Sequence, residues 1–189
     1  MLWKKTNLSF IIILFNSSII GLIFPDFDYF YIKSFFFKNF IGHRSIITHS
    51  ILIPSLICLF VFRRKILNKN LVVILIGLFL GLALHLTADF FPKGNDEAEF
   101  IKLPGNISIG KYSQIWIALN SLFSLYIVRK LLNSYFKEEY YRIQFLISSL
   151  VLTLFYIFFE TNNQFLILFT FSTVLIAIFL YEKKFTKIK

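Results

Sequence analysis

The side chains able to do chemistry gather in three short segments of this 189-residue chain. The chain has three His and four Asp, and every His and three of the Asp lie in its first 94 residues. Imidazole nitrogen and carboxylate oxygen together are the usual ligands of zinc, iron and manganese. The segments are Pro25-Asp26-Phe27-Asp28, His43–Ser50 and His85–Asp89. We therefore expect a metal or catalytic site built by residues 1–94.

The spacing within two of these segments indicates how their side chains converge. His85 and Asp89 are four residues apart, so on a helix they share one face and can bind one ion. Asp26 and Asp28 are two apart, so they point to one side only where the chain is extended. Pro25 favours an extended segment, because it disfavours helical geometry for the residue before it.

The third segment needs a bend to bring its two imidazoles together. His43 and His49 are six residues apart, which does not place them on one face of a helix. They can meet if His43 lies in an entry loop and His49 lies one turn inside a helix that Ser45 caps. Arg44 is suited to hold a phosphate with two parallel hydrogen bonds, or it anchors the chain at lipid headgroups.

The elements that must position these residues are membrane helices. Hydrophobic residues make up 57% of the chain and charged residues 16%, against about 45–50% and a quarter in soluble domains. Six runs without Lys, Arg, Asp or Glu have the length of roughly 20 residues that a spanning helix needs. These runs are Thr6–Phe24, Ser45–Phe62, Leu71–Ala88, Tyr112–Val128, Ile143–Phe159 and Thr161–Tyr181. We expect an all-α polytopic membrane protein forming one domain over 1–189, with apolar helices alone over 113–189.

Lysine and arginine set the expected orientation. Fourteen of the 20 lie at the N-terminus, in the second and fourth loops and in the C-terminal tail. The positive-inside rule then puts both termini in the cytoplasm and the three candidate segments at the extracytoplasmic face of a bacterial-type inner membrane. The same distribution accounts for the net charge of +10 without a contiguous basic face, so nucleic acid is not an expected partner.

Taken together, the three segments resemble a known family. Pro25-Asp26-x-Asp28, His43-Arg44 with Thr48-His49-Ser50, and His85 with Asp89 are similar to the elements of YdjM-like membrane-bound metal-dependent hydrolases, the LexA-regulated inner-membrane type. The resemblance covers about residues 20–95. The spacing between the two His of the second element is one residue longer here than in that family. The resemblance implies a metal-dependent hydrolase.

The donor set points to hydrolysis at a bound divalent cation. We expect zinc, with manganese or iron as alternatives, because such a cation lowers the pKa of bound water to about 7 and polarises a phosphoryl or acyl oxygen. Six candidate ligands exceed the three that one catalytic zinc usually takes, so either two ions bind or some residues act as base or outer partners. The candidate ligands, in the order of expectation, are His49, His85, Asp89, Asp28, Asp26 and His43, and the candidate catalytic residues are Arg44, Asp26 and His43.

A membrane location favours a lipid or lipid-linked ester or phosphoester, because such a substrate reaches the site by lateral diffusion. Two other classes remain open. A transporter or metal permease usually binds near the bilayer midplane between repeated halves, and 113–189 holds no counterpart of the three segments. In a non-enzymatic scaffold, the His and Asp side chains would only form hydrogen bonds. The loop Pro92–Lys111 is either a lid or a plain connection.

Overall fold

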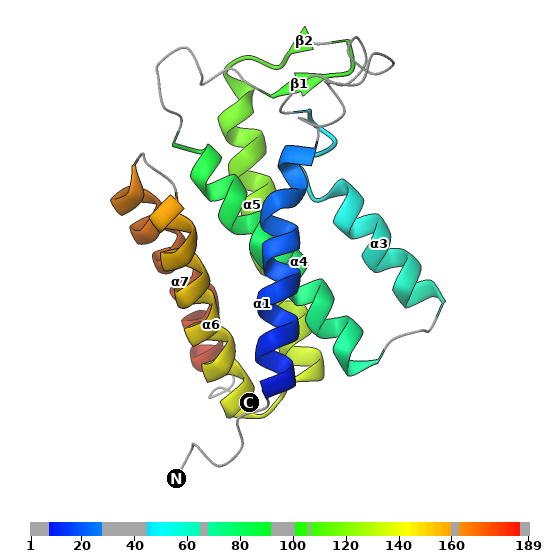
Figure 1. The fold of residues 1–189 in the computed structure, drawn as a ribbon, viewed down its shortest axis with the longest axis vertical. Helices are drawn as coiled ribbons and strands as arrows, with labels where there is room; N and C mark the ends of the chain where they lie inside the picture. The colour runs from blue at the N-terminus through cyan, green and yellow to red at the C-terminus, as the bar shows by residue number, and fades with distance from the viewer. Residues whose placement is uncertain are drawn as a thin grey trace.

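The computed structural model describes residues 8–27, 45–64, 68–91, 101–105, 107–159 and 163–185. The described chain is mostly helical, as expected, with one small hairpin (Figure 1). Its elements are α1 (Leu8–Ile23), the 3-10 turn η2 (Phe24–Asp26), α3 (Leu52–Arg63), α4 (Lys69–Asp89), β1 (Lys102–Leu103), β2 (Ile107–Ser108), α5 (Tyr112–Tyr135), α6 (Glu139–Phe159) and α7 (Gln164–Phe185).

Four helices of the described residues are long and apolar enough to cross a membrane. They are Leu8–Asp26, Lys69–Asp89, Tyr112–Tyr135 and Glu139–Phe158. Helix α3 has 12 residues and so measures about 18 Å, short of the roughly 30 Å hydrocarbon core. The apolar part of α7 is also shorter than a full span. The chain is a helical membrane protein, and the fifth and sixth spans stay predictions.

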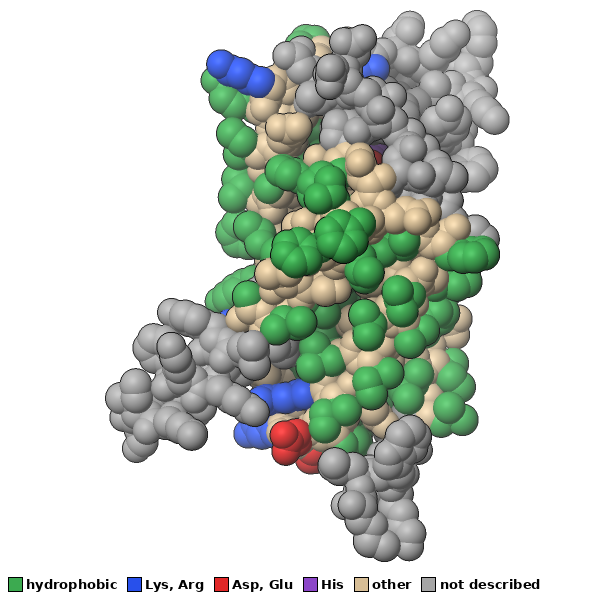
Figure 2. All heavy atoms as spheres, turned by 90° about the vertical axis from the view of Figure 1, so that its left-hand side faces the viewer, with side chains coloured by type: hydrophobic (Ala, Val, Ile, Leu, Met, Phe, Trp, Pro, Cys, Tyr) green, Lys and Arg blue, Asp and Glu red, His purple; other side chains and the backbone are tan. Residues whose placement is uncertain are grey.

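The exposed surface of the long helices has the composition of a lipid-facing surface. Large apolar side chains that stand out from the bundle include Phe123, Leu150 and Phe169. Figure 2 shows one such face, covered by hydrophobic side chains along its length, with the coloured charged side chains near its two ends. Apolar contact with lipid in the middle and charge at the ends is the arrangement that a bilayer requires.

Helix α4 forms the centre of the bundle. Fifteen of its 21 residues are buried, and its main contacts are with α1 and α5 (Figure 1). Val72, Ile76 and Phe79 are fully buried in the main core cluster. A helix that is apolar on all sides is stable only when protein or lipid surrounds it. Here the neighbouring helices surround α4.

Helices α1 and α4 touch backbone to backbone. A Cβ added to Gly21 would lie 2.8 Å from the backbone carbon of Leu78, and one added to Gly81 would lie 2.7 Å from the backbone nitrogen of Leu22. Only glycine therefore fits at these crossing points. Because Gly77, Gly81, His85 and Asp89 recur every four residues, the ridge that contacts α1 leads directly to the candidate ligands.

The second predicted run does not begin as a helix, so the expectation that Ser45 caps a helix with His49 one turn inside it is wrong. Residues 45–51 form a turn, and the Oγ of Ser45 accepts the Ile47 N–H at 3.1 Å inside that turn. Helix α3 begins at Leu52. The reason is Pro54, whose ring in a helix would clash with the carbonyl four residues earlier, at Ser50, so the helix cannot extend back to His49.

The expectation of an extended segment after the first helix is also wrong for the described residues, which reach Phe27. Residues 24–26 form a 3-10 turn, and Phe27 keeps helical angles (φ −60°, ψ −25°) with its N–H bonded to the Phe24 carbonyl. Pro25 lies in the first turn of this new helical segment, where its fixed φ is favourable and its missing N–H costs nothing. Asp26 therefore projects from a continuation of α1.

Several helices are longer than the charge-free runs that predict them. Helix α5 continues through Arg129 and Lys130 to Tyr135, well beyond the expected end at Val128. A charge ends the apolar stretch that can lie in hydrocarbon, but it does not break backbone hydrogen bonding. The described part of the loop before α5 pairs Lys102 with Ser108 as an antiparallel hairpin.

Candidate metal centre

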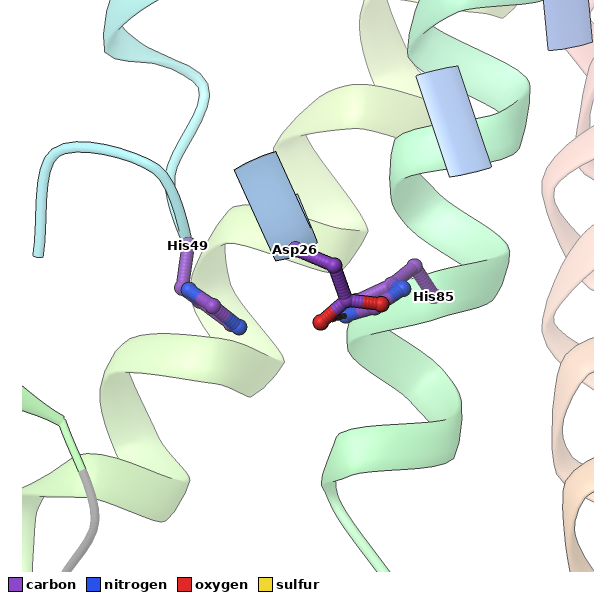
Figure 3. A group of neighbouring side chains, drawn as sticks. All are labelled: Asp26, His49 and His85. Carbon is purple, nitrogen blue, oxygen red and sulfur yellow. Dashed lines mark ion pairs between the residues drawn. The ribbon is translucent and has the colours of Figure 1, made fainter. Parts of the chain in front are cut away.

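Three parts of the chain that are distant in sequence bring potential ligands together. Asp26 comes from η2, His49 from the turn 45–51 and His85 from the last turns of α4. One ligand atom from each lies within 4.8 Å of the others. Figure 3 shows Asp26 beside His85, with the His49 ring pointing toward both. The convergence expected from the sequence is present for these three residues.

Asp89 lies between the two imidazoles. Its Oδ2 is 3.3 Å from Nε2 of His85, as their spacing of four residues predicts, and 3.4 Å from Nε2 of His49. The Oδ1 of Asp26 is 4.0 Å from Nε2 of His85. For metal–ligand bonds of about 2.0 Å, neighbouring ligand atoms of a tetrahedral zinc site are about 3.3 Å apart. The Asp89 contacts match that separation.

Burial divides the site into a closed part and an open part. The side chain of His49 is 1% exposed and that of His85 is 6% exposed, whereas Asp89 is 18% and Asp26 is 53% exposed. Both ring nitrogens of His85 are buried, and Nε2 faces the carboxylate oxygens of Asp89 and Asp26. Buried imidazole nitrogen beside carboxylate oxygen is a donor arrangement that fits a bound cation.

The charges of the group also fit a cation. Two carboxylates lie within 4.0 Å of the same imidazole nitrogen, and buried charge is tolerated only when it is paired. Two imidazoles and two carboxylates are a donor set that zinc, manganese and iron accept. The site is therefore a possible metal-binding group, and its donors alone do not choose among these metals.

The turn that carries His49 is bonded internally. The backbone N–H of His49 donates to the Ser45 carbonyl at 2.9 Å, and the Thr48 hydroxyl lies 3.1 Å from Nδ1 of His49. The N–H of Ile46 donates to the carbonyl of Lys102 at 2.8 Å, which ties the start of the turn to β1. With Nδ1 facing Thr48, the other ring nitrogen is directed toward Asp89.

Helix α5 supplies contacts that the sequence analysis missed. The indole Nε1 of Trp116 donates to the His49 carbonyl at 3.1 Å, and Oδ1 of Asn120 accepts the N–H of Ile51 at 3.0 Å. The described candidate ligands lie within residues 1–94, but the side chains that hold the His49 turn come from α5. The signal in the sequence is that Trp116 and Asn120, two hydrogen-bonding side chains in an apolar run, are four residues apart and so share one face of a helix.

Helix α5 is also bonded to α4, two residues beyond His85. The Thr87 hydroxyl is 3.0 Å from the hydroxyl of Ser121, and both donate to the carbonyl of Ala83. Hydroxyls that share one backbone carbonyl in this way let two apolar helices approach closely in a membrane. The helix carrying His85 and Asp89 is thus held on one side by α1 and on another by α5.

Several predicted site residues lie outside the described residues. These are Asp28, His43 and Arg44. Of the loop Pro92–Lys111 that would form a lid, residues 92–100 and 106 lie outside them as well. Their predicted roles as ligands, base or phosphate anchor stay predictions.

Comparison of the chain with family models, with curated proteins and with solved structures gives no match. The resemblance to YdjM-like hydrolases therefore rests on the three sequence segments alone.

Proposed function

We propose that this protein is a membrane-bound metal-dependent hydrolase, of the YdjM-like type that its three segments resemble. The observation that carries the proposal is the convergence of Asp26, His49, His85 and Asp89 from three separate segments, with both imidazoles buried and Asp26 open. Ionisable groups at membrane depth are costly to keep, so their gathering at one point favours a functional site over a structural one.

The four side chains divide naturally into ligands and base. His49, His85 and Asp89 form the tighter and more buried set, and three protein ligands are the usual number for a catalytic zinc. Zinc, when bound, supplies a Lewis acid that makes water nucleophilic at neutral pH. Asp26 is more than half exposed and 4.0 Å from His85, so it can accept the proton of the attacking water and pass it to solvent.

The proposed substrate is an ester or phosphoester of a lipid or lipid-linked molecule. Asp26 ends η2 and Asp89 ends α4, so the site is at the end of two helices that are long enough to span a membrane. A substrate that already lies in the bilayer arrives there without crossing water. The distribution of Lys and Arg supports an extracytoplasmic face for this end of the bundle.

The position of the ligands distinguishes this proposal from a metal permease. Permease sites lie near the bilayer midplane at broken helices, whereas these carboxylates lie at helix ends. A scaffold role differs in another way, because a scaffold has no need for a carboxylate that is open to solvent beside two buried imidazoles. It would also tolerate Asp26→Asn at normal abundance in the membrane.

The test is hydrolysis by the purified full chain loaded with zinc or manganese. The assay compares phospholipids in vesicles with short-chain soluble esters and phosphoesters, for wild type and for Asp26→Asn. We expect release of product from the lipid by wild type and loss of that activity in the variant. Cleavage of soluble substrates with none of the lipids would refute the lipid assignment, and no hydrolysis of either class would refute the enzyme.

A further inference from the structure

The turn 45–51 is the one described part of the site that is not helical. Asp89 and His85 are fixed by α4, and Asp26 is fixed by η2 at the end of α1. His49 has no helix of its own, because α3 begins at Leu52. Its position relative to Asp89 therefore depends on what holds the turn from outside.

Helix α5 holds the turn at two points, both on the C-terminal side of the His49 side chain. Trp116 donates to the carbonyl of His49 itself, and Asn120 accepts the backbone N–H of Ile51, two residues later. The two side chains lie four residues apart on one face of α5. They are also linked, because Nδ2 of Asn120 donates to the Trp116 carbonyl at 2.7 Å.

The geometry points to Trp116 and Asn120 as positioning residues of the metal centre. This inference rests on the proposed function, since it assigns the two residues the task of placing His49 as a ligand. The Trp116 bond fixes the carbonyl of His49, and the Asn120 bond fixes the start of α3. Together they set the direction from which the imidazole reaches Asp89, 3.4 Å away.

The two ends of the turn are held by different parts of the chain. The bond from Ile46 to Lys102 holds one end, before the side chain of His49. The two α5 bonds hold the other end of the turn, from His49 to Ile51. Partners that orient metal ligands typically contribute 10–100-fold to metal affinity, so we expect losses of that order.

The test measures cobalt binding by the purified full chain, because Co²⁺ reports its ligand geometry through its visible absorption spectrum. Trp116→Phe keeps an aromatic ring in the cluster with Leu86 but removes the N–H donor. Asn120→Leu removes both the acceptor and the Nδ2 donor, whereas Asn120→Asp keeps an acceptor oxygen for the Ile51 N–H and loses only the donor to the Trp116 carbonyl. Ser149→Ala is the matched control, because it removes a buried hydroxyl that donates to the Phe145 carbonyl within α6.

We expect Trp116→Phe and Asn120→Leu to bind Co²⁺ about tenfold or more weakly, with an altered spectrum, at an unchanged thermal midpoint. Asn120→Asp should recover most of the affinity, and Ser149→Ala should match wild type. Wild-type affinity and spectrum in Trp116→Phe and Asn120→Leu would overturn the positioning role. So would equal loss in Asn120→Asp and Asn120→Leu, because a role through the acceptor oxygen requires rescue.

The outcomes separate this inference from the proposal on which it rests. His49→Ala in the same assay reports whether the site binds metal at all. If His49→Ala loses Co²⁺ while Trp116→Phe and Asn120→Leu keep it, the metal centre stands and the positioning role falls. If wild type binds no Co²⁺, both fall.

Discussion

Asp26 and Asp89 are both within reach of His85, yet they differ in how they meet solvent. Asp89 Oδ2 lies 3.3–3.4 Å from both imidazoles and its side chain is 18% exposed, whereas Asp26 lies 4.0 Å from His85 and is 53% exposed. A ligand gains from being held between two other ligands. A general base gains from access to water. The geometry supports the role of metal ligand for Asp89 and the role of general base for Asp26.

This difference predicts that the isosteric changes Asp89→Asn and Asp26→Asn affect different properties, metal affinity in the first and hydrolysis in the second. Asp89→Asn should lower metal affinity by 10-fold or more, about the effect of weakening a ligand, because the amide carries no charge to pair with the cation. Asp26→Asn should keep the metal and lose hydrolysis. Metal titration and lipid hydrolysis on the same preparations make the comparison. Loss of metal in Asp26→Asn would instead make Asp26 a ligand.

At the residue scale, local spacing predicted only part of the site. The four-residue interval between His85 and Asp89 is a helix property, so it can be recognised in the sequence. The meeting of Asp26 with His85 depends on the crossing of α1 and α4, which no local pattern encodes. Trp116 and Asn120 could not be assigned, because their partners are backbone atoms of a turn 67 and 69 residues away.

At the scale of elements, the crossing of α1 and α4 places Asp26. The crossing needs glycine at Gly21, Gly77 and Gly81, since an added Cβ at each would overlap the other helix. The ridge of α4 residues that begins with Gly77 ends with His85 and Asp89. Any change that separates the two helices should therefore also move Asp26 away from His85.

Gly81→Ala tests this coupling. The added methyl must displace α1, because it would lie 2.7 Å from the Leu22 nitrogen. We expect a loss of about 1–3 kcal/mol in stability, the usual cost of overpacking, together with weaker lipid hydrolysis. Ile74→Ala is the control, because Ile74 is on the same helix and exposed. Thermal unfolding in detergent and the vesicle assay report the two effects. A Gly81→Ala protein that matches Ile74→Ala in both would contradict the coupling.

Two proline residues explain where element prediction failed. The apolar run from Ser45 was long enough for a helix, but Pro54 blocks the helix from reaching back past Ser50. Pro25 was expected to extend the chain, yet it begins a 3-10 turn that stays helical through Phe27. Both results follow from steric rules of proline, but which rule applies depends on the register of the helix around it. The lengths of runs do not reveal that register.

At the scale of the whole molecule, the prediction concerns the orientation of the bundle in the membrane. The hairpin before α5 and the turn between α5 and α6 lie at opposite ends of the bundle in Figure 1. The Lys and Arg distribution assigns the first end to the outside and the second to the cytoplasm. Composition predicted the membrane helices because hydrocarbon demands apolar length. Of the six predicted spans, the described residues carry four at full length.

Cysteine labelling tests this orientation in a Cys58→Ser background, which removes the one native cysteine. Ile107→Cys is in β2, where the native side chain is 62% exposed, and Lys137→Cys is between α5 and α6. A membrane-impermeant maleimide on intact cells should label residue 107 and reach residue 137 only after permeabilisation. The reverse pattern would place the metal site on the cytoplasmic side.

The most direct test of the central claim is the metal content of the detergent-purified full chain. Mass spectrometry compares wild type with His49→Ala and Asp89→Asn, and with Ser149→Ala as a control for purification. We expect zinc, manganese or iron near one ion per chain in wild type and control, and its loss in both site variants. A folded wild type that neither retains nor rebinds these metals would contradict the metal centre and the hydrolase built on it.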